Sequence, residues 1–349
     1  MRIDYLIIGQ GLAGSILAEH CLMAGLSIKV VSEVNASSSS MVAGGLYNPV
    51  TGRKMVKTWN ADNLFNYLTP FYQNLESQLK EQFLNEIPIY RPFLDFEAQN
   101  EWMGKSSEGS FDNFVQEVYT GSAFDELQDH YGGILLKNSG YLDTRHFVTV
   151  YHEKLRKKKL LIEEHFDHSL VEHSEDGIVY KGIKAKALLF CEGTAVRDNP
   201  FFNWLPFRPV KGEILTIETS HIPRVIYNRG VFVIGKKNAR CTVGATYDHN
   251  DLSLDATEKA KNELKEKLKK LINFDFKVVE HRVGIRPATK DRRPIIGVHP
   301  TLKHMYIFNG LGAKGVSLAP FYAKQLVDHL TAGAKLDNEI NIERYFSLF

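Results

Sequence analysis

The feature that most constrains the fold of this chain is a glycine-rich turn close to its N-terminus, at residues 9–14 (GQGLAG). The turn follows the apolar run at residues 3–8, which is typical of a buried strand. Apolar residues then recur at helical spacing from Leu12 until Gly25, and a second apolar run covers residues 28–31. Strand, glycine turn, helix and strand in this order predict a β-α-β unit of a parallel sheet.

The spacing inside this unit predicts a dinucleotide site. Gly9 permits the tight turn, Gly11 lets a pyrophosphate approach the backbone, and Gly14 lets the helix pack closely on the sheet. The free N–H groups at the start of the helix favour the phosphates. Glu33 follows the second strand and is placed to accept hydrogen bonds from ribose hydroxyls, which disfavours NADP. The alternative is a purely structural turn with Glu33 at the surface.

Composition narrows the class of protein. The chain has 43 Lys and Arg against 41 Asp and Glu, a net charge of 43 − 41 = +2, and 44% of its residues are hydrophobic. These values exclude a disordered chain and a protein that binds nucleic acid through its overall charge. Cys21, Cys191 and Cys241 have apolar neighbours and no metal-ligand spacing, so we expect buried thiols and no metal site. Without a secretory signal or a long apolar run, we expect a cytoplasmic protein.

The periodicity predicts α/β segments at the start, middle and end of the chain, with other material between them. Residues 37–40, with Gly44 and Gly45, are interpreted as a polar loop. Further helices are expected at 144–158, 255–272 and 319–330, and alternating apolar positions at 207–247 favour an antiparallel sheet. We therefore expect a discontinuous nucleotide domain and an inserted substrate domain. The expected segments are 1–58, 138–205 and 285–349 for the first, and 59–137 and 206–284 for the second.

Several further motifs resemble the FAD-dependent D-amino acid oxidase family, which includes glycine oxidase and sarcosine oxidase. In order, they are Ser39-Ser40 with Ala43-Gly44-Gly45, residues 187–193, 208–213, 243–246, 284–297 and 310–320. The resemblance covers nearly the whole chain. It implies a Rossmann-like FAD-binding domain with an inserted α+β substrate domain built on an antiparallel sheet. It also implies a non-covalent FAD, because no Cys follows Arg286 where sarcosine oxidase attaches its flavin.

The fingerprint and the resemblance together assign a set of residues to FAD. They are Gly9, Gly11, Leu12, Ala13, Gly14, Glu33, Ser39, Ser40, Gly44, Gly45, Leu46, His168, Gly193, Gly310, Gly312, Ala313, Lys314, Gly315 and Val316. The glycines of the last loop let the backbone press against a flat ring. N–H groups at the start of the following helix then stabilise the negative charge of a reduced flavin. A structural helix-initiation turn is the alternative for that loop.

Arg286 is the predicted substrate-binding residue. It lies between Ile285 and Pro287, and a buried unpaired cation is costly, so such an Arg usually has an anionic partner. Its fork binds a carboxylate in bidentate fashion. In glycine oxidase-like enzymes the matching Arg holds the substrate carboxylate. The alternative is an internal salt bridge, for example to Asp291.

The resemblance implies oxidation of the C–N bond of an amino acid or N-substituted glycine. Hydride passes to flavin N5, water hydrolyses the imine, and positioning makes a general base unnecessary. Tyr247 and Phe232 are further pocket candidates, although Phe232 lacks the hydroxyl of the matching Tyr in glycine oxidase. Ala313, with Lys314 beside it, occupies the place of a second substrate Arg. Thr242 replaces the oxygen-activating Lys of sarcosine oxidase.

Other motifs resemble the oxidase domain of the bifunctional tRNA wobble-uridine methylaminomethyl biosynthesis protein. They are residues 45–49, 282–286, 288–291 and 311–315. This similarity implies a second possible activity, oxidation of a carboxymethylaminomethyl group on tRNA. RNA binding requires a basic surface, for which Arg53, Lys54 and Lys57 or the run at 154–159 are candidates, although solvated faces are the commoner explanation. A non-enzymatic flavoprotein is the third alternative. We expect a small-molecule substrate and no membrane partner.

Overall fold

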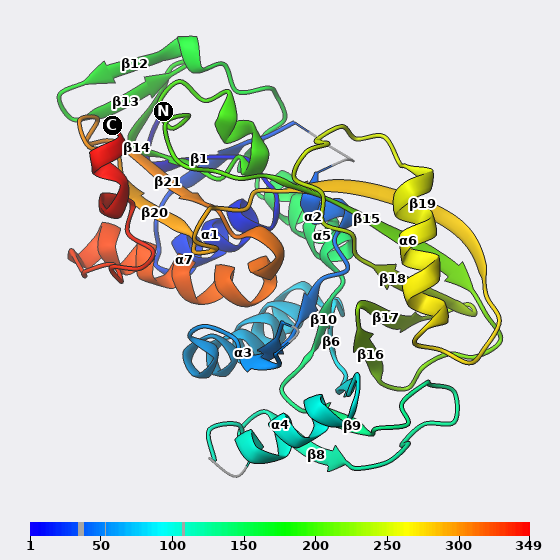
Figure 1. Ribbon diagram of the computed structural model, residues 1–349. Coiled ribbons are helices and arrows are strands. Elements are labelled where there is room, and N and C mark those ends of the chain that lie inside the picture. The colour runs from blue at the N-terminus through cyan, green and yellow to red at the C-terminus, as the bar shows by residue number, and fades with distance from the viewer. Residues whose placement is uncertain (34–37, 53, 107–108) are drawn as a thin grey trace.

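The structure is a computed structural model that describes residues 1–33, 38–52, 54–106 and 109–349 (Figure 1). Its first sheet is mixed, and its central strands are parallel. The path of this sheet is β11 (Leu161–Ile162), β2 (Ile28–Val31), β1 (Arg2–Ile8), β14 (Ile183–Phe190), β13 (Gly177–Tyr180) and β12 (Val171–Ser174). Strand β21 (Met305–Asn309) pairs in parallel with the end of β14 and antiparallel with β20 (Ile295–Val298).

Both faces of the central strands are covered, which explains why the carboxyl-terminal halves of β1, β2 and β14 are apolar. Tyr5 and Ile7 of β1 pack in the core that contains α1 (Leu12–Met23) and α7 (Gly315–Ala332). Leu6 and Ile8 point to the other face and pack in a second cluster with the C-terminal segment. The predicted β-α-β unit is confirmed, because β1 and β2 pair in parallel on either side of α1 in the chain.

The second sheet is mainly antiparallel and lies beside the first (Figure 1). Its path is β19 (Lys277–Arg286), β15 (Val210–Glu218), β18 (Arg240–Gly244), β17 (Val231–Lys236), β16 (Ile226–Arg229), β7 (Ile89–Pro92), β9 (Gly133–Leu136) and β8 (Val115–Tyr119). The mixed α/β class with a second, antiparallel sheet is therefore as the sequence predicts.

The two faces of the second sheet have different neighbours. Leu215 and Ile217 of β15 point outward and pack against Leu264 and Leu268 of α6 (Glu258–Lys269). Because side chains alternate along a strand, the even-numbered residues of β15 point to the opposite face. This inner face meets α2 (Ser39–Val42), which packs against β19 and against α5 (Thr144–Lys157).

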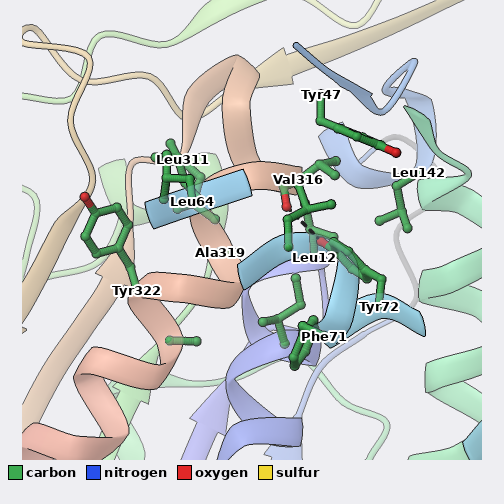
Figure 2. Close-up of a cluster of buried hydrophobic side chains, with 14 of the residues drawn as sticks. Leu12, Tyr47, Leu64, Phe71, Tyr72, Leu142, Leu311, Val316, Ala319 and Tyr322 are labelled. Carbon is green, nitrogen blue, oxygen red and sulfur yellow. Dashed lines mark hydrogen bonds between the residues drawn. The ribbon is translucent and has the colours of Figure 1, made fainter. Parts of the chain in front are cut away.

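The remaining elements connect these layers. The other α-helices are α3 (Ala61–Leu79) and α4 (Phe96–Ser106), and the short 3-10 helices are η1 (His168–Leu170), η2 (Gly193–Arg197), η3 (Gly312–Lys314) and η4 (Ile342–Leu348). Two small sheets pair β3 (Leu46–Tyr47), β10 (Gly140–Leu142) and β6 (Leu84–Glu86), and β4 (Val50–Thr51) with β5 (Val56–Lys57). Figure 2 shows the core where α1, α3 and α7 meet.

Some element bounds differ from those predicted. Ser39 and Ser40 lie in α2 rather than in a polar loop, and Ser37 lies outside the described residues. The helix expected at 319–330 begins earlier, at Gly315, so Pro320 lies inside it, and the Val316 carbonyl oxygen that lacks its helical partner accepts a hydrogen bond from Tyr72 at 3.0 Å. The helix expected at 255–272 is limited to α6, whose N-cap is Thr257. Strand β19 continues to Arg286, so it crosses the expected domain boundary at 284/285.

All three cysteines are free and buried, as expected from their apolar neighbours. Burial raises the pKa of the Cys21 thiol to about 12. Within the described residues, we find no group of three or more His, Cys, Asp or Glu side chains placed to hold a metal ion. Nor does the described part of the chain contain a helix that is long and apolar enough to span a membrane.

Candidate functional site

The predicted nucleotide-binding segments meet at one edge of the first sheet. Strands β2, β1, β14 and β21 are parallel in that order, so their carboxyl ends share an edge. The glycine turn follows β1, Glu33 follows β2, Gly193 follows β14, and Gly310 follows β21. In open α/β sheets ligands bind at this edge.

The first turn has the geometry that a closely approached phosphate requires. Gly9 has φ +95°, and a Cβ atom at Gly14 would lie 1.8 Å from the Gly9 carbonyl oxygen, so only glycine fits there. Gly11 is the N-cap of α1, and the next residue, Leu12, donates its N–H to the Ser40 hydroxyl at 3.0 Å. The structure therefore brings Ser40 to the start of the helix, and Ala13 follows within the same turn.

Glu33 and His168 lie at the periphery of this edge. The Glu33 carboxylate is more than half exposed and lies 3.3 Å from Nδ1 of His165. The His168 ring is turned toward Glu192, with 3.1 Å between Nε2 and Oε1, and its carbonyl accepts the N–H of Val171. The His168 ring is therefore engaged by Glu192, and the assignment of His168 to the cofactor remains a prediction.

The last glycine loop packs beside the first. Asn309, at the end of β21, donates its side-chain N–H to the Gly193 carbonyl oxygen at 2.9 Å. A Cβ atom at Gly315 would lie 3.0 Å from the Leu12 side chain. Val316 belongs to the same core cluster as Leu12 and accepts a hydrogen bond from Tyr72 on its carbonyl oxygen (Figure 2). Two loops some 300 residues apart in sequence thus form one site.

The η3 turn places Gly312, Ala313 and Lys314 directly before α7. Ala313 is exposed, while Lys314 is partly buried. Burial lowers the pKa of Lys314, and the positive charges of Arg293 and Arg292 lower it further. The loop therefore presents a destabilised cation beside a helix N-terminus, a combination that favours an anionic partner.

The second predicted segment, residues 44–46, lies between the two sheets. Gly45 has φ +70°, and a Cβ atom there would lie 1.8 Å from the Leu142 carbonyl oxygen. Gly44 lies against the Phe232 ring, because a Cβ atom at Gly44 would be 2.5 Å from Cζ of that ring. Leu46 begins β3. Phe232 is therefore the contact through which the second sheet reaches this segment.

Arg286 ends β19 on the inner face of the second sheet. A Cβ atom at Gly212, on the neighbouring strand β15, would lie 2.3 Å from Nη2 of Arg286, so the missing side chain leaves room for the guanidinium. Nη1 donates to the Thr246 carbonyl oxygen at 3.2 Å. The Tyr247 ring, itself largely exposed, lies over the guanidinium with 4.4 Å between Cζ and the ring centroid.

The charge of Arg286 has no counter-ion among the described residues. Asp291, the acid considered above as a partner of Arg286, is instead paired with Arg344 at 3.1 Å. Burial lowers the pKa of Arg286, and the contact with Tyr247 opposes this effect. A partly buried cation with one neutral acceptor has donors left for an incoming carboxylate. The alternative of an internal salt bridge between Arg286 and Asp291 does not occur in the structure.

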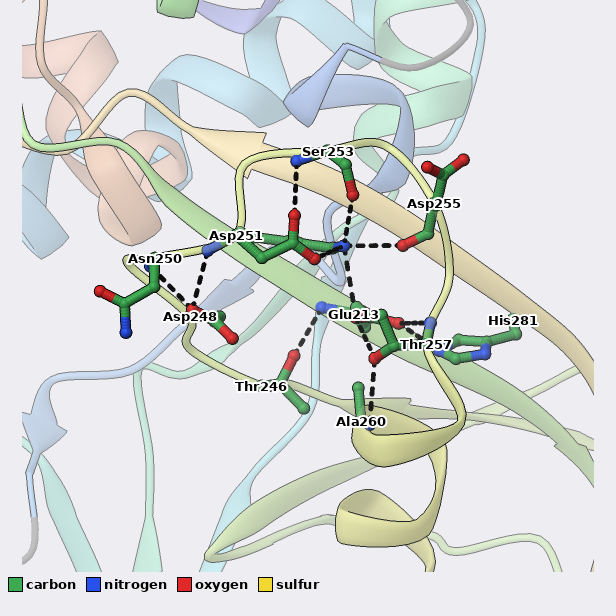
Figure 3. Close-up of polar contacts among 11 residues, drawn as sticks. Glu213, Thr246, Asp248, Asn250, Asp251, Ser253, Asp255, Thr257, Ala260 and His281 are labelled. Atoms are coloured by element: carbon green, nitrogen blue, oxygen red, sulfur yellow. Dashed lines mark hydrogen bonds and ion pairs between the residues drawn. The ribbon is translucent and has the colours of Figure 1, made fainter.

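A polar network on the outer face holds the segment that carries Tyr247 (Figure 3). The buried Lys211 ammonium donates to Asp251, to the Ser253 hydroxyl at 3.1 Å and to the Asp255 carbonyl oxygen at 2.7 Å. Glu213 accepts two hydrogen bonds from Thr257, both 2.9 Å. These contacts tie residues 246–257 to β15, and so they fix Tyr247 over Arg286.

The described residues fit FAD. The free N–H groups at the start of α1, the glycine cradle and the carboxylate of Glu33 suit pyrophosphate and ribose. The start of α7 with Lys314 suits an electron-rich ring edge. Sequence considerations missed Gly212, because its role depends on the pairing of β15 with β19. A group of cations on the second sheet was not predicted either, because its members come from separate segments and do not form a run in the sequence.

The two basic runs are partly engaged in local ion pairs. Lys154 is buried and paired with Glu19, and Arg156 pairs with Glu153 at 2.7 Å. In the other run Lys57 pairs with Asp62 at 2.6 Å, and Arg53 lies outside the described residues. Some cations of both runs are thus engaged in local ion pairs, whereas Lys157, Lys158 and Lys159 are exposed and carry no ion pair to a described residue.

Comparison with known proteins places the chain in a family. The chain is 28% identical over 209 residues to glycine oxidase of Bacillus subtilis, a match that spans 55% of each protein. It is 22% identical over 352 residues to the tRNA 5-methylaminomethyl-2-thiouridine biosynthesis bifunctional protein MnmC of Idiomarina loihiensis, over 95% of this chain and 56% of that protein. The chain therefore spans about half the length of these two relatives.

The fold has a close counterpart among solved structures. Iminodiacetate oxidase from Chelativorans sp. BNC1 superposes with a TM-score of 0.78 at 20% identity, over 98% of both chains. The model of the DAO family, described as FAD dependent oxidoreductase, matches residues 4–329. This match covers both glycine loops and Arg286. The chain belongs to the DAO family of FAD-dependent oxidoreductases.

Proposed function

We propose that this FAD-dependent oxidoreductase oxidises the C–N bond of an amino acid or an N-substituted glycine, and that Arg286 binds the substrate carboxylate. The observation that carries the proposal is the partly buried guanidinium of Arg286, which has no acid partner among the described residues. The names of relatives support the class of substrate, because glycine and iminodiacetate are both amines with a carboxylate.

The residues around Arg286 position a substrate rather than react with it. FAD, when bound, supplies the acceptor for a hydride from the carbon beside the amine. The Thr246 carbonyl oxygen holds one end of the guanidinium, and Tyr247 covers its face. The remaining N–H groups orient the carboxylate, and orientation alone supplies a large part of the rate. Water then hydrolyses the imine product.

The test is anaerobic reduction of the FAD-loaded protein by a panel of amino acids, N-substituted glycines and modified nucleosides. We expect bleaching of the flavin absorbance by at least one carboxylate-bearing amine. Arg286→Met should raise the apparent KM about 100-fold or more, since a charged, bidentate partner is lost, while the protein stays yellow. Arg224→Met, at an exposed site, is the matched control. Loss of FAD in Arg286→Met would instead show a structural role for this Arg.

We also propose that FAD is bound non-covalently. Denaturation should then release all of the yellow colour into the protein-free supernatant. Colour that remains with the precipitated chain would contradict this proposal.

A second candidate is oxidation of a carboxymethylaminomethyl group on tRNA. It is supported by the similarity to MnmC, which extends over 95% of this chain. The same Arg286 would bind the carboxylate of the modified nucleoside. Binding of tRNA that weakens steeply with salt would support this candidate, and reduction by free amino acids alone would favour the first.

A further inference from the structure

Cationic side chains from separate segments gather at the far end of the inner face of the second sheet. They come from α5, from β17 and the turn after it, from β18 and from β19, and they are Arg145, Lys236, Lys237, Arg240 and Arg282. They line a cavity of about 210 Å³, which we call the cationic cavity. Among its described lining residues, Asp143 is the only acid.

The cationic cavity is separate from the place where Arg286 lies. Arg282 and Arg286 are four residues apart on β19 and point to the same face, so they are roughly 13 Å apart along the strand. Gly284 lies between them on this face, and a Cβ atom there would be 3.1 Å from Cβ of Val42, so Val42 of α2 stands over the sheet between the two arginines. One sheet face thus carries two positive regions.

The charges of the cationic cavity are only partly balanced. Arg240 pairs with Glu218 at 3.2 Å, Arg282 lies 3.3 Å from Glu280, and Lys236 lies 3.7 Å from Asp143. Neither of the other two cations, Arg145 and Lys237, has a side-chain ion pair or hydrogen bond within the described part of the chain. Five positive and three negative groups leave 5 − 3 = +2 around the cavity.

Two details show that the imbalance is costly. Nε of Arg282 is buried and donates no hydrogen bond to a described residue, although Glu280 is close. Burial lowers the pKa of Lys236, Asp143 opposes this effect, and the nearby charge of Arg282 adds to it. The Lys236 ammonium lies 3.6 Å from the centroid of the Tyr141 ring, a contact that stabilises it only in part. A bound anion would relieve both groups.

We propose that the cationic cavity binds the phosphate group of a small molecule. The charge of a phosphate dianion matches the excess of +2, and arginine and lysine donors from three sides suit its oxygens. The cavity is open to solvent and is bordered by the sheet, by the Ala43-Gly44 segment and by α5, and its volume accommodates one such group. The site does not depend on the reaction proposed for Arg286.

The test measures binding of inorganic phosphate to the FAD-loaded protein by calorimetry, with sodium chloride adjusted to keep the ionic strength constant. We expect one saturable site in the wild-type protein. The double variant Arg145→Gln, Lys237→Gln removes the two cations without an acid partner, so it leaves no carboxylate unpaired. It should weaken phosphate binding at least tenfold, and Arg282→Gln should do the same.

The control is the double variant Lys259→Gln, Lys269→Gln on α6, which changes the net charge by the same amount at exposed positions. It should bind phosphate as the wild-type protein does, and melting curves without phosphate check that every variant is folded. Equal weakening in both double variants, or no saturable site at constant ionic strength, would overturn the proposal. Tight tRNA binding without phosphate binding would also overturn it, in favour of an RNA contact. Because no turnover is measured, a failed reaction at Arg286 would leave this result unaffected.

Discussion

The glycines of the candidate site fall into two groups that differ in the atoms a side chain would meet. One group lies against backbone carbonyl oxygens, and the other lies against side chains. A side chain at Gly14, at the edge of the first sheet, or at Gly45, beside β10, would meet a backbone carbonyl oxygen at 1.8 Å. Near the second sheet, a side chain at Gly212 would meet the Arg286 guanidinium at 2.3 Å, and one at Gly44 would meet the Phe232 ring at 2.5 Å. Gly44 and Gly45 are adjacent in the chain but belong to different groups.

The difference separates what holds the fold from what shapes the site. A backbone oxygen in a sheet or a helix turn has no room to retreat, so a methyl group against it disrupts the element itself. The end of a long side chain can move away at a small cost in stability, but the displaced group then no longer makes its functional contact. We therefore expect substitutions of the first kind to change stability and FAD content, and those of the second kind to change substrate binding.

The largest effect is expected for Gly14→Ala. The new methyl group would lie 1.8 Å from the Gly9 carbonyl oxygen, so α1 must shift away from β1. We expect destabilisation by more than about 4 kcal/mol and loss of yellow colour in the purified protein. The matched control is Gly25→Ala, at the end of the same helix, where φ is +72° but no atom lies within 4 Å of the new group. It should cost about 1 kcal/mol and leave the FAD content unchanged. Equal FAD content in both variants would contradict the comparison.

The next effect is a pH dependence of stability that we expect from the first region. His20 on α1 is buried against Phe71, and burial lowers its pKa to about 4 from 6.5. The unfolded chain therefore binds a proton below pH 6.5 that the folded chain takes up only near pH 4. Stability is highest above pH 6.5 and falls by about 2 kcal/mol between pH 6.5 and pH 5.

Chemical denaturation of the wild-type protein and of His20→Leu at pH 7 and pH 5 measures this term. The variant should lose about 2 kcal/mol less than the wild-type protein on acidification. The contact between Lys211 and Asp251 in the second region should not respond in this window, because it is the main reason that the pKa of Asp251 is lowered to about 2. That contact contributes stability above the unfolded pKa of 3.8 and loses it as the pH falls through 2. A pH slope that His20→Leu leaves unchanged would exclude His20 as its source.

The two regions also differ in how far the sequence predicts them. The edge of the first sheet depends on short, contiguous signals, so the β-α-β unit, the last glycine loop and the buried cysteines are as predicted. Arg286 was found because its apolar neighbours leave it without a nearby acid. The role of Gly212 and the cationic cavity depend on strand register and on segments far apart in the chain, which local patterns do not contain. The short helix at Ser39 and Ser40 was missed because four polar residues have no periodicity.

The third effect is on substrate binding alone. In Gly212→Ala the new methyl group meets only the mobile end of Arg286, so the guanidinium should move while the apparent melting temperature stays within a degree or two of the wild-type value. We expect the apparent KM to rise about tenfold, because a displaced guanidinium loses one of its two hydrogen bonds to the carboxylate. In the Arg286→Met background the same substitution should change KM by less than about twofold. An equal effect in both backgrounds would show that the methyl group acts through another contact.

The smallest effect is expected for Gly44→Ala. This variant tests whether the Phe232 ring can move away from a new methyl group, as a guanidinium can, or is held in place, as a backbone oxygen is. The new methyl group would lie 2.5 Å from Cζ of the Phe232 ring, and that ring is also held on the side of Gly244, where a Cβ atom would be 2.8 Å from it. A ring confined on both sides moves less freely than a guanidinium, so we expect a cost of about 1 kcal/mol in unfolding free energy. In a Phe232→Leu background that cost should nearly vanish, since the smaller side chain vacates the space. If the cost were the same in both backgrounds, the strain would lie in the backbone of the segment, and Gly44 would belong with Gly45 among the positions that hold the fold.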